Sequence, residues 1–153
     1  EVGASPSVTY PFSLFLCTVP RSDQAEQRVS KYRENGLDAY YSEVALRRGI
    51  RYRVYAGYFE SAEQAEKFKM GKALKEAEVK ETPFANLIGT FISQDKLEGE
   101  NQSLKGLGFS PYVIKEADGK QRLLVGAFYN QERARRQHEE LKSRGIENQI
   151  VER

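Results

Sequence analysis

The first half of the chain opens with two sets of side chains that alternate along residues 12–17. One set is Phe12, Leu14 and Leu16, and the other is Ser13, Phe15 and Cys17. This period of two is typical of a β-strand. Residues 51–59 alternate in the same way, and shorter strands are predicted around residues 40–44 and Val79, with a turn at Arg48 and Gly49.

Two helices are predicted between these strands. Ala25, Val29 and Tyr32 follow the spacing i, i+4, i+7, which places them on one apolar stripe of a helix. Ser22 can act as the N-cap of this helix. The sequence Ser-Ala-Glu-Gln from Ser61 is a capping-box pattern and predicts the start of a second helix.

The second half of the chain repeats the pattern of the first. The blocks YPFSLFLCTV, ENGLDAYY and YRVYAGYF correspond, in the same order, to TPFANLIGTF, GLGFSPYV and QRLLVGAF. The correspondence places Tyr40 on Tyr112, Arg53 on Arg122 and Gly57 on Gly126. Three blocks in one order indicate a tandem repeat. We therefore expect an N-terminal tail over residues 1–9, a first copy over residues 10–82 and a second copy over residues 83–153.

Each copy has the element order β-α-β-β-α-β with short connections. This order gives a four-stranded antiparallel sheet with both helices on one face, so the expected class is α+β, with two ferredoxin-like (RNP-like) units in tandem. The joint KEAEVKETP contains no Gly or Ser, which predicts a rigid connection. Alternation along the third strand directs four side chains toward the helices, namely Tyr52, Val54, Ala56 and Tyr58. It directs another set to the open face, namely Arg51, Arg53 and Tyr55 in the first copy and Arg122 and Leu124 in the second.

Composition narrows the class of protein. Of the 153 residues, 39% are hydrophobic and 30% are charged, which is typical of a globular chain. The net charge of +2 is too small to predict nucleic-acid binding. The element order is also that of an RNA-recognition motif, but the third strand lacks the aromatic pattern on which that module stacks bases. No stretch approaches the ~18 apolar residues of a membrane span, so we expect no direct membrane insertion by this part of the protein.

Little in the sequence indicates catalysis. The chain has one cysteine, Cys17, and one histidine, His138, too few for a disulfide or a cysteine–histidine metal cluster. It contains no Gly-rich phosphate loop and no nucleophile elbow. We therefore expect no enzymatic activity, no metal and no cofactor.

Both copies resemble the SPOR (sporulation-related repeat) domain. The motif YRVYAGYF, followed by Ala65, and the motif LIGTF from Leu87 carry the resemblance. The resemblance implies binding to the glycan strands of bacterial peptidoglycan, particularly denuded strands that have lost their stem peptides. It also implies a place in the periplasm or on the extracytoplasmic face of the envelope, within a longer and in some cases membrane-anchored protein, including proteins of cell division.

The resemblance and the expected open faces together mark candidate glycan-binding residues. They are Tyr40, Arg51, Arg53, Tyr55, Tyr112 and Arg122. An arginine can donate planar hydrogen bonds to hydroxyls or carboxylates, and a tyrosine can offer its ring to a sugar. Either type can instead serve ordinary packing or face solvent. The first copy is expected to carry most of the affinity for glycan. The second copy has Leu124 where the first has Tyr55, and a leucine cannot both stack on a sugar and form a hydrogen bond with it.

Three apolar residues on the same faces suggest a different use. SPOR domains that bind glycan typically carry Gln on the first strand where this chain has Phe15 and Leu87. Exposed apolar residues gather at interfaces, so Phe15, Leu87 and Leu124 are candidate interface residues, covered by the other copy, a loop or a partner. The main hypothesis is a non-catalytic peptidoglycan-binding module. The alternative is an assembly module that has lost glycan binding and contacts envelope or division proteins.

Overall fold

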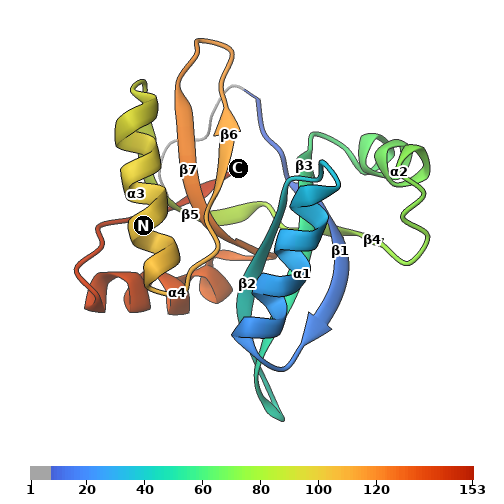
Figure 1. Cartoon of the computed structure of the whole chain (residues 1–153), viewed down its shortest axis with the longest axis horizontal. Helices are drawn as coiled ribbons and strands as arrows, with labels where there is room; N and C mark the ends of the chain where they lie inside the picture. The colour runs from blue at the N-terminus through green and yellow to red at the C-terminus, as the bar shows by residue number, and fades with distance from the viewer. Residues whose placement is uncertain (1–7) are drawn as a thin grey trace.

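The computed structural model describes residues 8–153, so residues 1–7 of the expected tail lie outside the described part of the chain. The elements follow the β-α-β-β-α-β order twice (Figure 1). The first run is β1 (Phe12–Val19), α1 (Ser22–Glu34), β2 (Ala39–Leu46), β3 (Gly49–Phe59), α2 (Ala62–Gly71) and β4 (Glu78–Glu81). The second run is β5 (Phe84–Phe91), α3 (Gln94–Gly106), β6 (Tyr112–Lys115), β7 (Gln121–Phe128), α4 (Gln131–Ser143) and β8 (Gln149–Glu152).

Each run folds around its own four-stranded antiparallel sheet, and we call the two units the first and the second repeat. The strand order is β2-β3-β1-β4 in the first repeat and β6-β7-β5-β8 in the second. Helices α1 and α2 pack on one face of the first sheet, and α3 and α4 pack on one face of the second. The predicted α+β class with two ferredoxin-like units is confirmed.

The faces beneath the helices are filled largely by the residues that the alternation predicted. Val54 and Ala56 of β3 are fully buried and pack with Val29 of α1 and Ala65 of α2. Leu123 of β7 is buried in the same way beneath α3 and α4. Full burial of a Val or Leu side chain contributes about 1.5–3 kcal/mol each, which makes these faces the main cores of the two repeats.

One of the two predicted helix starts differs in the structure. The Oγ of Ser61 caps α2 and accepts a hydrogen bond from the backbone N of Gln64 at 3.1 Å, as the capping box predicted. The prediction that Ser22 caps α1 was wrong. Ser22 is the first residue of that helix, and the N-cap is Arg21, whose side chain pairs with Asp23 at 3.0 Å.

A glycine in β3 and its counterpart in β7 reverse the alternation of side chains. Gly57 and Gly126 have φ angles of +72° and +83°, and the pairing of β3 with β1 shifts beside Gly57. Tyr58 therefore points away from the helices and packs edge-on against Tyr10, with 5.2 Å between ring centroids. Phe59 takes the place beneath α2. The prediction that Tyr58 faces the helices was wrong because a bulge adds one residue to the strand.

The repeats are joined by only two residues, Thr82 and Pro83, between β4 and β5. The backbone N of Thr82 donates to the carbonyl of Pro11 at 2.7 Å, and its hydroxyl lies 2.6 Å from the Oγ of Ser13. At the equivalent position after β8, the backbone N of Arg153 donates to the carbonyl of Pro83 at 2.7 Å. The closing strand of the first repeat therefore runs almost directly into the second repeat, and the rigidity of this connection stays a prediction.

The sheet faces without helices pack against each other. Side chains from both repeats form one buried cluster, which we call the inter-repeat cluster. Its buried members are Tyr40, Tyr55, Ala85, Tyr112, Ile114, Leu124, Ala127 and Val151, and Tyr10, Phe15, Tyr58 and Leu87 pack at its edge. The faces that the sequence analysis left open are thus largely covered, because each repeat removes the apolar face of the other from water.

Candidate functional site

The centre of the inter-repeat cluster is a pair of tyrosines at equivalent positions. The rings of Tyr40 and Tyr112 stack with centroids 4.0 Å apart and an interplanar angle of 19°. Their hydroxyls make equivalent bonds, Tyr40 donating to the carbonyl of Gly57 at 2.9 Å and Tyr112 to that of Gly126 at 2.6 Å. The exposure predicted for Tyr40, Tyr112 and Tyr55 was wrong, because their rings pack on one another between the repeats.

A charged side chain that the sequence analysis did not single out extends into this cluster. The guanidinium of Arg153 is fully buried and donates to the Tyr40 hydroxyl at 2.8 Å and to Thr82 Oγ1 at 2.7 Å. It also lies 3.5 Å from the Tyr112 hydroxyl. Burial raises the pKa of Tyr112 well above its usual range, so this hydroxyl remains protonated and keeps its bond to the Gly126 carbonyl. Arg153 thereby ties the end of the second repeat to a ring of the first.

Arg122, the counterpart of Arg53, is buried as well. Its Nε forms an ion pair with Glu116 Oε1 at 2.5 Å. Its Nη1 and Nη2 donate to the main-chain oxygens of Glu152 and Arg153 at 3.3 and 3.2 Å. The exposed position predicted for Arg122 was wrong, and the guanidinium instead binds the main chain at the end of β8.

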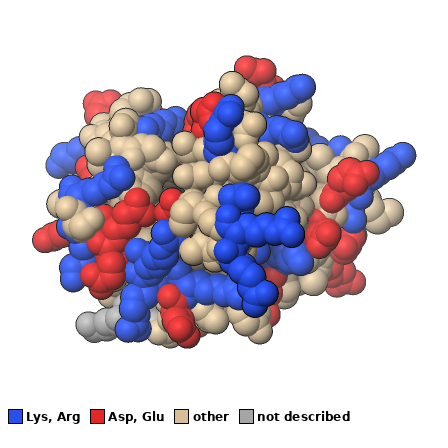
Figure 2. Space-filling view, turned by 90° about the horizontal axis from the view of Figure 1, so that it is seen from below, with Lys and Arg blue, Asp and Glu red and all other residues tan. Residues whose placement is uncertain are grey.

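Part of the first repeat's helix-free face remains open in a groove between the repeats. The groove has a volume of about 970 Å³. Strands β1, β2, β3 and β4 line one side, and the segment from the end of β7 into α4 lines the other. We call it the basic groove, and its lining includes Phe15, Ser42, Arg53 and Tyr55 of the first repeat and Tyr129, Arg133 and Arg136 of the second. Figure 2 looks at the side of the molecule on which α4 and the tip of the β2–β3 hairpin lie, and Lys and Arg side chains gather near the middle of this view.

Arg53 stands at the centre of the strand wall. In the sheet, Arg53 lies directly opposite Ser42 of β2 on one side and Thr18 of β1 on the other. Its side chain is half-buried. Ser42 is only 4% exposed, and its Oγ has no hydrogen-bond partner within the described residues. Buried hydroxyls in native structures almost always have a partner. The Ser42 hydroxyl beside the Arg53 guanidinium is therefore a candidate contact for a polar ligand in the groove.

The remaining sequence candidates are divided between the groove and the packed cluster. Arg51 is half-buried, donates to the carbonyl before it at 2.9 Å, and is outside the groove lining. Phe15 lines the groove and packs on Tyr55 with 5.9 Å between centroids. Leu87 and Leu124 pack in the inter-repeat cluster. The sequence analysis offered the other copy, a loop or a partner as the cover for these apolar residues. The structure shows that it is the other copy.

Sequence reasoning missed the half of the groove that comes from the second repeat. Tyr129 is 59% exposed at the end of β7, and Arg133 and Arg136 are exposed on α4. Arg133 and Arg136 belong to α4, which packs on the helix-covered face of the second sheet, and Tyr129 directly follows β7. They line the groove only because the second repeat docks on the first, and alternation within a repeat carries no information about that docking.

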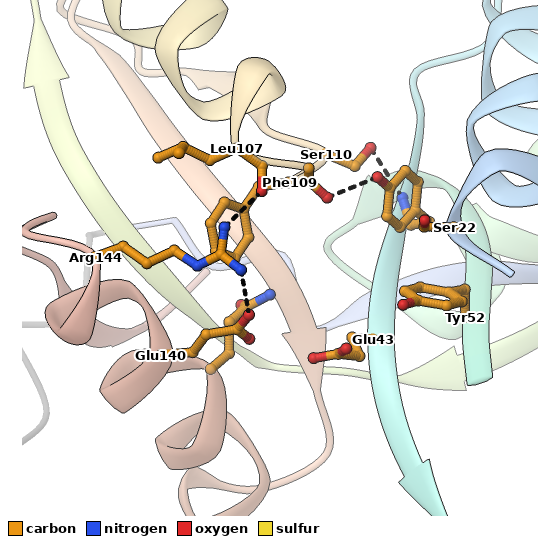
Figure 3. A pocket seen from close by; sticks show the side chains of 11 residues that line it. Ser22, Glu43, Tyr52, Leu107, Phe109, Ser110, Glu140 and Arg144 are labelled. Carbon is orange, nitrogen blue, oxygen red and sulfur yellow. Dashed lines mark hydrogen bonds and ion pairs between the residues drawn. The ribbon is translucent and has the colours of Figure 1, made fainter. Parts of the chain in front are cut away.

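A smaller hollow of about 200 Å³ lies between the repeats near β2 and the loop before β6 (Figure 3). Tyr41 holds the two sides together. Its backbone N donates to Ser110 Oγ at 3.1 Å and its hydroxyl to the carbonyl of Gly108 at 2.8 Å. Burial raises the pKa of Tyr41 to about 12. Glu43 of the first repeat and Glu140 of the second face this hollow from opposite sides.

The Glu43 carboxyl has a raised pKa because it is partly buried and because Glu140 lies beside it, while Arg136 and Arg144 act in the opposite direction. A folded-state pKa above the unfolded value means that ionised Glu43 costs stability at neutral pH. This cost disappears as the pH falls toward the ordinary value of 4.5. Glu43→Gln should therefore stabilise the protein at pH 7.5, by less than about 1 kcal/mol because the carboxyl is still partly solvated.

Urea unfolding of the parent and Glu43→Gln at pH 7.5, 6 and 4.5 tests this expectation. The stability difference should be largest at pH 7.5 and should vanish near pH 4.5. Glu147→Gln, at an exposed position, is the matched control and should follow the parent at every pH. A Glu43→Gln variant less stable than the parent at pH 7.5 would contradict the assignment.

The described residues offer little for catalysis or metal binding. No group of three or more His, Cys, Asp or Glu in residues 8–153 is placed to hold a metal ion. Burial raises the pKa of the Cys17 thiol more than nearby Arg28 lowers it, which disfavours the reactive thiolate. Within the same residues, no helix is long and apolar enough to cross a membrane.

Comparison with known families agrees with the architecture of two repeats. A family model described as "SPOR domain" matches residues 20–81 and again residues 87–152. The two matches fall on the first and second repeats. Neither a search of curated proteins nor a search of solved structures gave a match. The chain belongs to the SPOR domain family and carries two copies of the domain in tandem.

Proposed function

We propose that the chain is a non-catalytic module that binds the glycan strands of peptidoglycan in the basic groove. SPOR domains are peptidoglycan-binding domains, which supports the general role. The observation that carries the proposal is the groove itself. It is the part of the first repeat's helix-free face that the second repeat leaves uncovered, and it combines Arg53 with the unpartnered Ser42 hydroxyl.

The chemistry of the groove suits a sugar strand. Tyr129 and Phe15 offer apolar surface against which the face of a sugar ring can pack. Arg53 supplies planar donors for ring substituents, and Ser42 supplies a hydroxyl. Binding sites for small ligands measure about 300–1,000 Å³, so the volume accommodates a short stretch of glycan.

The two repeats have different roles in this proposal. The first repeat, over residues 10–82, supplies the sheet face that contacts the strand, and the second, over residues 83–153, supplies the opposite wall. Denuded strands are the preferred ligand, because a groove with walls on two sides leaves little room for stem peptides. The setting is the periplasmic or extracytoplasmic side of the envelope, where the module forms part of a longer protein.

Replacing Arg53 by Ala is expected to weaken binding to peptidoglycan about five- to a hundred-fold. Loss of a charged hydrogen-bonding partner costs about 1–3 kcal/mol. The measurement is co-sedimentation with purified sacculi whose stem peptides have been removed by an amidase. Arg51→Ala is the matched control, because Arg51 lies two residues away on the same strand but outside the groove lining, and it should bind like the parent.

Melting curves of both variants separate binding from folding. Equal binding by the parent and a folded Arg53→Ala variant would contradict the groove as the site. A parent that binds no sacculi at all would contradict the proposed function, and release of muropeptides by the pure protein would contradict its non-catalytic character.

A protein-interaction role has less support. The apolar residues that suggested it are Phe15, Leu87 and Leu124. All three pack in or at the edge of the inter-repeat cluster. Contacts within the chain therefore account for their apolar character without an external partner.

A further inference from the structure

The wall that the second repeat contributes to the basic groove carries two arginines. Arg133 and Arg136 stand three residues apart on α4, so they project from the same side of the helix. Both are exposed and both line the groove. Arg53 lines it from the first repeat, so guanidinium groups face the groove from two directions.

Carboxylates also line the groove. An arginine of the lining is free to bind a ligand only if none of these carboxylates already pairs with it. Glu43, Glu81 and Glu132 are part of the lining. Glu43 lies close enough to Arg136 for the arginine to lower its pKa, so Arg136 is partly compensated. Within residues 8–153, neither Arg133 nor Arg53 forms an ion pair. Neither guanidinium is thus neutralised by a carboxylate, although Arg53 also interacts with the Tyr55 hydroxyl.

We infer that the second repeat gives the groove an anion subsite, in which Arg133, assisted by Arg136, binds a carboxylate carried by the glycan strand. This inference rests on the proposed function and specifies its ligand. Hydrolysis of the amide that links a stem peptide to the strand leaves a free carboxylate on the sugar, whereas a strand that still bears peptides has an uncharged amide there. The subsite thus distinguishes denuded from peptide-bearing strands by charge.

The residues present fit this chemistry. A guanidinium binds a carboxylate through two parallel hydrogen bonds, which gives both strength and orientation. The Ser42 hydroxyl, 4% exposed and without a partner, is available for a further hydrogen bond in the same groove. The arginines of α4 and the Ser42 hydroxyl come from different repeats and line the same groove.

The test compares one glycan in two charge states. Amidase-treated strands are used either as such or with their carboxylates converted to methyl esters, and chitin oligosaccharides serve as an uncharged reference. The parent should bind the carboxylate form at least about tenfold more tightly than the ester. This preference should shrink as ionic strength rises, because the arginines are exposed to solvent.

Variants of the α4 arginines test which residues cause the preference for the carboxylate form. Arg133→Gln together with Arg136→Gln should bind the carboxylate and ester forms with equal affinity, and Arg133→Gln alone should lose most of the preference. Arg135→Gln is the matched control, since Arg135 is exposed on α4 but outside the groove lining, and it should keep the preference. All three positions are exposed, so melting temperatures should remain near that of the parent.

The outcomes separate the two proposals. Equal binding of the carboxylate and ester forms by the parent would overturn the anion subsite and leave glycan binding intact. A full preference retained in the double variant would overturn the assignment to α4. Absence of binding to any glycan by the parent would instead overturn the proposed function.

Discussion

Replacing Tyr40 by Ala is expected to destabilise the protein by about 3–5 kcal/mol, the range for removing a large buried aromatic side chain. The ring is fully buried and stacks on Tyr112 on one side and Tyr55 on the other. Its hydroxyl accepts a hydrogen bond from the buried guanidinium of Arg153. Alanine would leave a cavity between the repeats and would also remove an acceptor from a buried charge, which adds to the cost.

Chemical denaturation followed by circular dichroism measures this loss. Tyr129→Ala is the matched control, because the same substitution at a side chain that is 59% exposed should change stability by less than about 0.5 kcal/mol. Tyr40→Phe removes only the hydroxyl and should cost about 1–3 kcal/mol. If Tyr40→Ala were as stable as the parent, the two repeats would not pack through this cluster in solution.

The centre of the inter-repeat contact joins equivalent residues, because Tyr40 and Tyr112 stack on each other. The two equivalent arginines nevertheless have different surroundings. Arg122 is held by Glu116 and by the main-chain oxygens of Glu152 and Arg153, whereas Arg53 lies in the groove. In the proposed function, Arg53 is therefore free to contact the ligand while Arg122 is not, and the second repeat contributes through α4 instead.

The fold of each repeat could be predicted from the sequence because its determinants are local and occur twice. A period of two, a helical stripe and capping residues place the elements, and the second copy confirms their order. The docking of the repeats could not be predicted in this way. Alternation shows that Tyr40, Tyr55 and Tyr112 share helix-free faces, but it does not show what covers those faces.

The candidate site was predicted only in part for the same reason. Arg53 was correctly placed on an accessible part of its sheet, but Arg122 has the same sequence position and is buried. In the second repeat Arg122 pairs with Glu116 and donates to the main-chain oxygens of Glu152 and Arg153, which buries it. One error could have been avoided, because a glycine within a strand, such as Gly57, often marks a bulge and so predicts the reversed side of Tyr58.

Gly126→Ala is expected to destabilise the protein by about 3 kcal/mol, from two separate causes. The residue has a φ of +83°, a conformation that costs an L-residue about 1–2 kcal/mol. A Cβ atom there would also lie 2.7 Å from Cζ of the Phe128 ring and would overlap the side-chain oxygen of Gln137. That oxygen accepts a hydrogen bond from the buried Asn86 amide at 3.0 Å. Overpacking of a core typically costs a further 1–3 kcal/mol.

Gly145→Ala separates the two causes. Gly145 has a similar φ of +79°, but nothing lies within 4 Å of the position its Cβ would take. Gly145→Ala should therefore lower the stability only by the cost of the left-handed backbone conformation, about 1–2 kcal/mol. Urea unfolding of both variants gives the comparison, and the excess loss of stability in Gly126→Ala reports the packing of Phe128 against α4 and its residue Gln137. Equal losses in the two variants would show that this region yields to the added methyl group. The bulge would then be required only for its backbone conformation.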